Sequence, residues 1–114
     1  NRLEKDLREK PDDVNLHRLL GVSYAGLGRK EAAIREGKLA VEMLPVSKDA
    51  IWGPGVVENL AFIYVLVGEQ NAAIDQIEYL LSIPSGLSVP LLRIDPRWDP
   101  LRKNPRFQKL LERS

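Results

Sequence analysis

The chain of 114 residues contains no cysteine and a single histidine, His17. The lack of cysteine excludes disulfide bonds, thiolate metal sites and cysteine-based catalysis. A serine–histidine–aspartate arrangement would depend on His17 alone, and this residue stands at a helix position that ordinarily serves packing. We therefore expect His17 to be structural, and we expect the chain not to be an enzyme and to use no cofactor or metal ion.

Long apolar runs are also missing. The longest, Leu60–Val67, has eight residues, far fewer than the roughly 20 that cross a bilayer. The N-terminal residues 1–6 are charged and lack the apolar core of a signal peptide. We therefore expect a cytoplasmic protein without membrane insertion. Because the chain does not begin with methionine, we also expect it to be part of a longer protein.

Neither sign of charge dominates, because the chain has 17 basic and 16 acidic side chains. The charges are unevenly spread, however, and residues 93–114 carry seven basic and three acidic side chains. These basic residues alternate with proline, tryptophan, leucine and phenylalanine, whereas phosphate binding requires several converging cations. We expect a solvated basic face here rather than phosphate contact, and we expect no nucleic-acid partner.

What the chain does contain is an internal repeat, which indicates an architecture before any single residue is interpreted. Each copy ends at a proline, Pro45 or Pro84. No alternating pattern of useful length predicts a strand, so the fold class should be all-α. Six positions recur with an offset of 40 residues: Leu20, Gly21, Tyr24, Gly28, Ala33 and Ala40 return as Leu60, Ala61, Tyr64, Gly68, Ala73 and Leu80.

Periodic apolar residues, with glycine and proline at the boundaries, predict where the helices lie. Two helical hairpins are expected, one from residues 13–27 and 30–44 and one from residues 54–67 and 71–82. Gly28 and Gly68 supply their turns. A short helix is expected over residues 1–10, with Leu3 and Leu7 on one face and Pro11 at its end.

The spacing of the repeated residues resembles that of the tetratricopeptide repeat, a helix-turn-helix unit that stacks into a protein-binding solenoid. The resemblance implies antiparallel helical repeats over residues 14–47 and 54–87. Residues 1–12 would be the trailing helix of a preceding repeat, and residues 88–114 a C-terminal cap. The family's period is about 34 residues, so the surplus residues are expected between Pro45 and Pro54, as a longer loop or an extra helical turn.

Two positions depart from the family's pattern. His17 stands where the family usually has tryptophan, and Gly37 stands where it has a large aromatic residue. A missing aromatic side chain leaves a cavity that costs roughly 3–5 kcal/mol, by analogy with Phe→Ala substitutions. We expect Trp52, from the longer connection, to fill the space at Gly37.

The last segment is interrupted by proline and should form short helices. Asn104 is a good N-cap, so a helix is expected over about residues 105–112. Asp95 and Asp99 are expected to cap turns rather than to bind a metal ion. The residues that exclude one continuous helix are Pro90, Pro96, Pro100 and Pro105.

A terminal cap should cover the last apolar face of a helical stack. Trp98, Leu101 and Phe107 are the side chains expected to provide this cover. Residues 90–111 are also similar to the C-terminal ends of bacterial multidomain signalling proteins. That similarity implies an accessory domain that follows a kinase, cyclase or DNA-binding domain.

In tetratricopeptide proteins, ligands usually lie in a concave groove lined by the first helix of each repeat. Arg18 and Asn59 match two positions that clamp a peptide's terminal carboxylate, but Val22 replaces the clamp's asparagine. A mixed polar and apolar groove that takes a peptide or a helix is therefore favoured. The alternative for Phe62 is packing against the C-terminal segment. The groove residues that the resemblance implies are Asn15, Arg18, Val22, Glu58, Asn59, Phe62 and Leu66.

The expected function is a non-enzymatic protein–protein interaction module that binds a peptide or helix of a protein partner. One alternative is a homodimerisation domain or an intramolecular regulatory domain of a larger bacterial signalling enzyme, because Leu3 and Leu7 lack a partner helix at the start of the chain. Another is a module of a larger enzyme whose catalytic residues lie upstream. The chain alone would then show no turnover.

Overall fold

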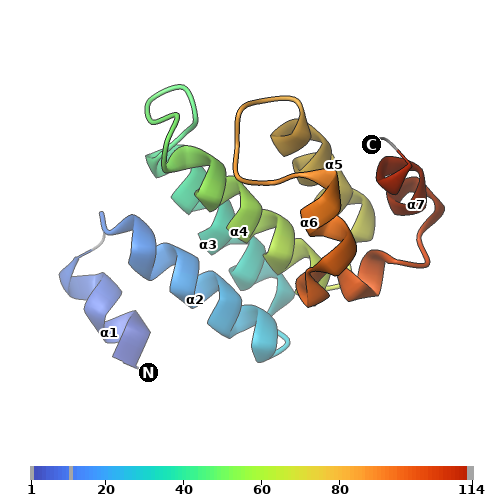
Figure 1. Ribbon diagram of the computed structural model, residues 1–114. Coiled ribbons are helices and arrows are strands. Elements are labelled where there is room, and N and C mark those ends of the chain that lie inside the picture. The colour runs from blue at the N-terminus through green and yellow to red at the C-terminus, as the bar shows by residue number, and fades with distance from the viewer. Residues whose placement is uncertain (1, 11, 113–114) are drawn as a thin grey trace.

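The computed structural model describes residues 2–10 and 12–112, and over these ranges it contains helices and no strand (Figure 1). The expected all-α class is confirmed. The helices are α1 (Arg2–Glu9), α2 (Val14–Gly26), α3 (Lys30–Met43), α4 (Gly53–Leu66), α5 (Gln70–Leu81), α6 (Val89–Ile94), the 3₁₀ helix η1 (Pro96–Leu101) and α7 (Pro105–Leu111).

Two helical hairpins, α2–α3 and α4–α5, form the centre of the molecule and pack against each other through α2, α3 and α4 (Figure 1). Both turns place glycine in the left-handed region, with φ of 77° at Gly28 and 83° at Gly68. In the first turn Arg29 N–H donates to Tyr24 O at 2.9 Å, and the bond 40 residues later has the same length. The repeated glycines therefore produce the same helix termination twice.

Small residues allow these helices to approach closely. An added Cβ at Gly21 would lie 2.7 Å from Ile63 Cδ1 and 3.3 Å from Ala33 O. Ala33, Ala61 and Ala73 have no exposed surface. The side chain of Ile63 thus occupies the space that any larger residue at position 21 would need.

The expectation that Trp52 fills the space at Gly37 is wrong. Trp52 is 70% exposed. An added Cβ at Gly37 would lie 2.9 Å from both Leu60 Cδ1 and Ile63 Cδ1. These two aliphatic side chains of α4 fill the position, so no aromatic residue is needed there. The surplus residues form a longer loop, because α3 ends at Met43 and α4 begins at Gly53.

The C-terminal segment packs as three short helices, with α7 against α5 and α6, and η1 against α4. Ser88, Asp95 and Asn104 cap α6, η1 and α7, because each side chain accepts a hydrogen bond from a backbone N–H of the helix that follows. Asp99 instead lies within η1 and pairs with Arg102 at 2.8 Å. The prediction of capping is therefore confirmed for Asp95 and wrong for Asp99.

The three side chains expected to cover the end of the helical stack are buried. Trp98, Leu101 and Phe107 have no exposed surface and belong to the core cluster that also contains α4 and α5 residues. Truncating one large core side chain typically costs about 2–5 kcal/mol. Residues 89–111 are therefore held in the fold by several such side chains.

The N-terminal helix α1 contacts α2. Tyr24 O–H donates a 2.9 Å hydrogen bond to Glu4 Oε2, which lowers the pKa of Glu4 and raises the pKa of Tyr24. The side chains of Leu3 and Leu7, expected to share an apolar face, and Pro11, expected to end the first helix, lie outside what the structure describes.

Candidate functional site

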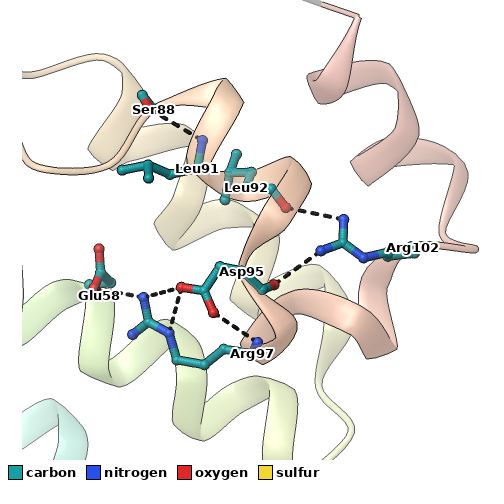
Figure 2. Close-up of polar contacts among 7 residues, drawn as sticks. All are labelled: Glu58, Ser88, Leu91, Leu92, Asp95, Arg97 and Arg102. Atoms are coloured by element: carbon teal, nitrogen blue, oxygen red, sulfur yellow. Dashed lines mark hydrogen bonds and ion pairs between the residues drawn. The ribbon is translucent and has the colours of Figure 1, made fainter.

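Part of the predicted groove on α4 is covered by the chain's own C-terminal segment (Figure 2). Arg97 Nη2 lies 3.1 Å from Glu58 Oε2 and 2.7 Å from Asp95 Oδ2. The guanidinium carbon also lies 6.0 Å from the centroid of the Phe62 ring. Phe62 thus packs beneath η1, which is the alternative that the sequence left open for this residue.

The Arg97 contacts hold η1 in place but are not what stabilises it most. Hydrogen bonding to Arg97 lowers the pKa of Asp95, and the same bond raises the pKa of Arg97. Partly exposed ion pairs of this kind contribute only about 0–1 kcal/mol each. The buried Trp98 beside Arg97 contributes more, so a partner could not readily displace η1 from Glu58 and Phe62.

An open hollow lies at the other end of the predicted groove, where the N-terminal halves of α2 and α4 meet the 44–52 loop. Its volume is about 520 Å³. It brings together two of the predicted site residues, Asn15 and Arg18. Two others lie outside the hollow: Val22 is half-buried against the core between the two hairpins, and Leu66 is exposed. We call it the Arg18 hollow, and it is lined by Val14, Asn15, Arg18, Leu44, Trp52, Gly55 and Val56.

Two buried hydrogen-bond donors on α2 and α4 have no acceptor among the described residues. They are Arg18 Nε, in the hollow, and Asn59 Nδ2, one helical turn after the lining residue Gly55. Arg18 Nη1 donates to Asn15 Oδ1 at 3.2 Å, but Nε of the same guanidinium has no partner. A buried donor without a partner costs about 1–3 kcal/mol. Both side chains are only half-buried, so a rotation that brings the donor to an acceptor on another molecule would recover that free energy.

A third buried donor of this kind, Trp98 Nε1, belongs to a side chain with no exposed surface. The ring stacks beside the Arg97 guanidinium, with 5.0 Å from the guanidinium carbon to the ring centroid. This donor therefore lies within the C-terminal core, where no partner could reach it without unfolding that segment.

Trp52 stands at the rim of the Arg18 hollow on a loop with a fixed shape. The backbone N–H groups of Ile51 and Trp52 donate to Asp49 Oδ1 at 3.0 Å and 2.9 Å. An added Cβ at Gly53 would lie 2.9 Å from Val46 Cα, so the start of α4 packs directly on the loop backbone. Ile51 and Trp52 are 80% and 70% exposed. A large, exposed aromatic side chain on a hydrogen-bonded loop is typical of an interface anchor.

Sequence reasoning missed Trp52 because it assigned the side chain to the core. The signal was present in the longer connection, since the residues added between Pro45 and Pro54 include Trp52 next to a glycine. An insertion at a loop tip is more often exposed than buried.

The arginines of the C-terminal segment are used within the fold. Arg93 donates to Leu111 O at 2.5 Å, and Arg102 donates to Leu92 O at 3.1 Å. Arg106 pairs with Asp75, at 2.6 Å, and with Glu78. The hydrogen bond to Asp75 raises the pKa of Arg106. These cations therefore face different internal acceptors and do not converge on a common point.

His17 lies in the interior rather than in a cleft. His17 Nδ1 is 2.5 Å from Glu36 Oε2, and the two residues are 7% and 6% exposed. The pair links α2 to α3.

Among the described residues, no group of three or more histidine, aspartate or glutamate side chains could hold a metal ion. Within residues 2–10 and 12–112, every helix is too short or too polar to span a bilayer.

No protein-family model, curated protein or solved structure matches the chain. The resemblance to tetratricopeptide repeats therefore remains a prediction from the residue pattern. The geometry itself supplies the candidate site, which consists of the Arg18 hollow, the two unpartnered donors and the exposed Trp52.

Proposed function

We propose that the chain is a tetratricopeptide-like interaction module that binds a segment of a partner protein at the Arg18 hollow. The proposed repeats are the hairpins α2–α3 and α4–α5, supported by the 40-residue offset and the matching turns at Gly28 and Gly68. The module would act in the cytoplasm, with no catalytic role of its own.

The observation that supports this function most directly is a buried donor without an acceptor, on the Arg18 side chain that lines an open hollow. A second such donor, on Asn59, lies one helical turn after the lining residue Gly55. Arg18 Nε and Asn59 Nδ2 call for carbonyl or carboxylate oxygens. The backbone of a bound peptide offers such oxygens at every residue. The exposed Trp52 ring beside the hollow offers apolar surface for one of the peptide's side chains. A polypeptide segment satisfies both requirements at once.

The function is tested with random dodecapeptides displayed on phage and selected on the immobilised protein. Arg18→Met and Asn59→Leu replace the donors with apolar side chains of similar volume, which should leave the free protein as stable as before or more so. Lys38→Met removes an exposed cation on α3 and serves as the control. Circular dichroism verifies that each variant is folded.

We expect the wild type to enrich specific peptides that bind both donor variants about tenfold or more weakly, which is the size of effect usual for a central interface residue. The Lys38→Met variant should bind them as the wild type does. A selection that enriches no peptide would contradict the proposal. So would peptides that bind Arg18→Met and Asn59→Leu as tightly as they bind the wild type.

A further inference from the structure

A second hollow adjoins the first on the far side of Gly55. It has a volume of about 410 Å³, and Trp52 and Gly55 line both hollows. We call it the Glu58 hollow; its lining also includes Ile51, Glu58, Leu80 and Ser85. The exposed Trp52 ring therefore stands between two depressions on one continuous surface.

The two hollows carry opposite charge. Among the described lining residues, Arg18 is the charged side chain of the first hollow and Glu58 that of the second. Glu58 shares the Arg97 guanidinium with Asp95 (Figure 2). The guanidinium is therefore shared between two carboxylates and does not neutralise Glu58 alone, whereas among the described residues no carboxylate lines the Arg18 hollow.

We propose that both hollows together form one docking site with a fixed direction, which takes a partner segment bearing an acidic residue, a bulky apolar residue and a basic residue in sequence. The acidic side chain lies toward Arg18, the apolar side chain packs on Trp52, and the basic side chain lies toward Glu58. This inference rests on the proposed function and adds the partner's chemistry. The apolar contact supplies most of the affinity, because partly exposed charges contribute little, and the charges set the order.

Gly55 provides a way to close this site without disturbing the fold. It lies in the first turn of α4, between the two hollows, and an added Cβ would meet no atom within 4 Å. Leucine is a better helix former than glycine, so Gly55→Leu should fold at least as well as the wild type while its side chain fills the space beside Trp52. Gly26 is the matched control, because it is also helical and has no atom within 4 Å of an added Cβ.

The test uses random dodecapeptides selected on the wild type, followed by two synthetic peptides. One has the selected sequence, and the other has its acidic and basic residues exchanged. Binding is measured by fluorescence anisotropy for the wild type, Gly55→Leu and Gly26→Leu, at low and at high salt.

We expect the selected sequence to bind the wild type and Gly26→Leu equally, and Gly55→Leu about tenfold or more weakly. The exchanged peptide should bind the wild type several-fold more weakly, and this difference should shrink at high salt because salt screens exposed charges. Selected peptides that lack either charge, or an exchanged peptide that binds equally well, would overturn the directional site and leave the proposed function standing. Peptides that bind Gly55→Leu as tightly as the wild type, or no selected peptide at all, would overturn both.

Discussion

The backbone N–H of Trp52 donates a 2.9 Å hydrogen bond to Asp49 Oδ1, and this bond holds the backbone of this exposed residue at the rim of the Arg18 hollow. The same carboxylate oxygen accepts from Ile51 N–H, so one side chain organises the tip of the loop. A loop whose backbone is already held loses less conformational entropy when a partner binds. The position of Trp52 is therefore as important to the proposed site as its exposure.

Replacing Asp49 should release this loop. Asp49→Ala removes the acceptor for two backbone N–H groups and should cost about 1 kcal/mol of stability, as loss of a capping side chain does. Selected peptides should bind the variant several-fold more weakly, while Asp49→Asn, which keeps an acceptor oxygen, should bind nearly as the wild type does. Isothermal titration calorimetry on the three proteins measures this. Equal affinity for Asp49→Ala would show that the ordered loop is irrelevant to binding.

The glycines should differ sharply in their tolerance of a methyl group. Ala at Gly21 or Gly37 would press on Ile63, and overpacking of a dense core typically costs about 1–3 kcal/mol. Ala at Gly26, where the space is open, should instead stabilise the helix by up to about 1 kcal/mol. Urea unfolding of the three variants gives these free energies. A Gly37→Ala protein as stable as the wild type would contradict the assigned packing of Ile63.

The buried pair between His17 and Glu36 should show strong coupling. His17→Leu leaves the Glu36 carboxylate without this partner in the interior, and breaking a buried pair on one side costs about 3–5 kcal/mol. The double variant His17→Leu/Glu36→Leu removes both polar groups and should lose much less stability. A double-mutant cycle by chemical denaturation measures the coupling. Additive losses from the two single substitutions would count against a direct interaction.

The C-terminal segment should weaken in acid through Asp95. Hydrogen bonding to Arg97 lowers the pKa of Asp95 in the folded state. In the unfolded chain, the pKa of an aspartate is about 3.9. The stability that this carboxylate contributes is therefore fully present above its unfolded pKa and is lost as the pH falls through its lowered folded pKa. Asp95→Asn keeps a side chain able to cap η1 but removes the charge.

The stability difference between the wild type and Asp95→Asn should be largest at neutral pH and should shrink toward pH 3. Unfolding free energies measured across this range, at constant ionic strength, test the prediction. A difference that stays constant with pH would mean that the charge of Asp95 does not stabilise the fold.

Much of the fold could be predicted because glycine and proline act locally. The turn residues Gly28 and Gly68 lie where their backbone freedom is needed, and Pro105 follows the Asn104 cap as expected. Each of these assignments depends on the φ angle or hydrogen bonding of a few neighbouring residues. The helix boundaries accordingly differ from the predicted ones by only a residue or two.

The errors concern how distant side chains share space, which local patterns do not specify. A glycine at position 37 was expected to leave a cavity for Trp52. The Leu60 and Ile63 side chains occupy that space instead, and Trp52 lies on the surface. Phe62 was a groove candidate, but Arg97, 35 residues later, lies over its ring. Arg18 and Asn59 were predicted as groove residues, but their lack of acceptors is visible only in three dimensions.

The most direct test of the proposed site is an NMR titration of ¹⁵N-labelled protein with the tightest selected dodecapeptide. The two indole N–H signals serve as probe and internal reference, because Trp52 is 70% exposed and Trp98 is fully buried. We expect the Trp52 indole, the Arg18 Nε–H and the Asn59 side-chain amide to shift together and saturate, while the Trp98 indole stays in place. A titration in which these three signals remain fixed, or in which the Trp98 indole shifts most, would place binding elsewhere and contradict the account.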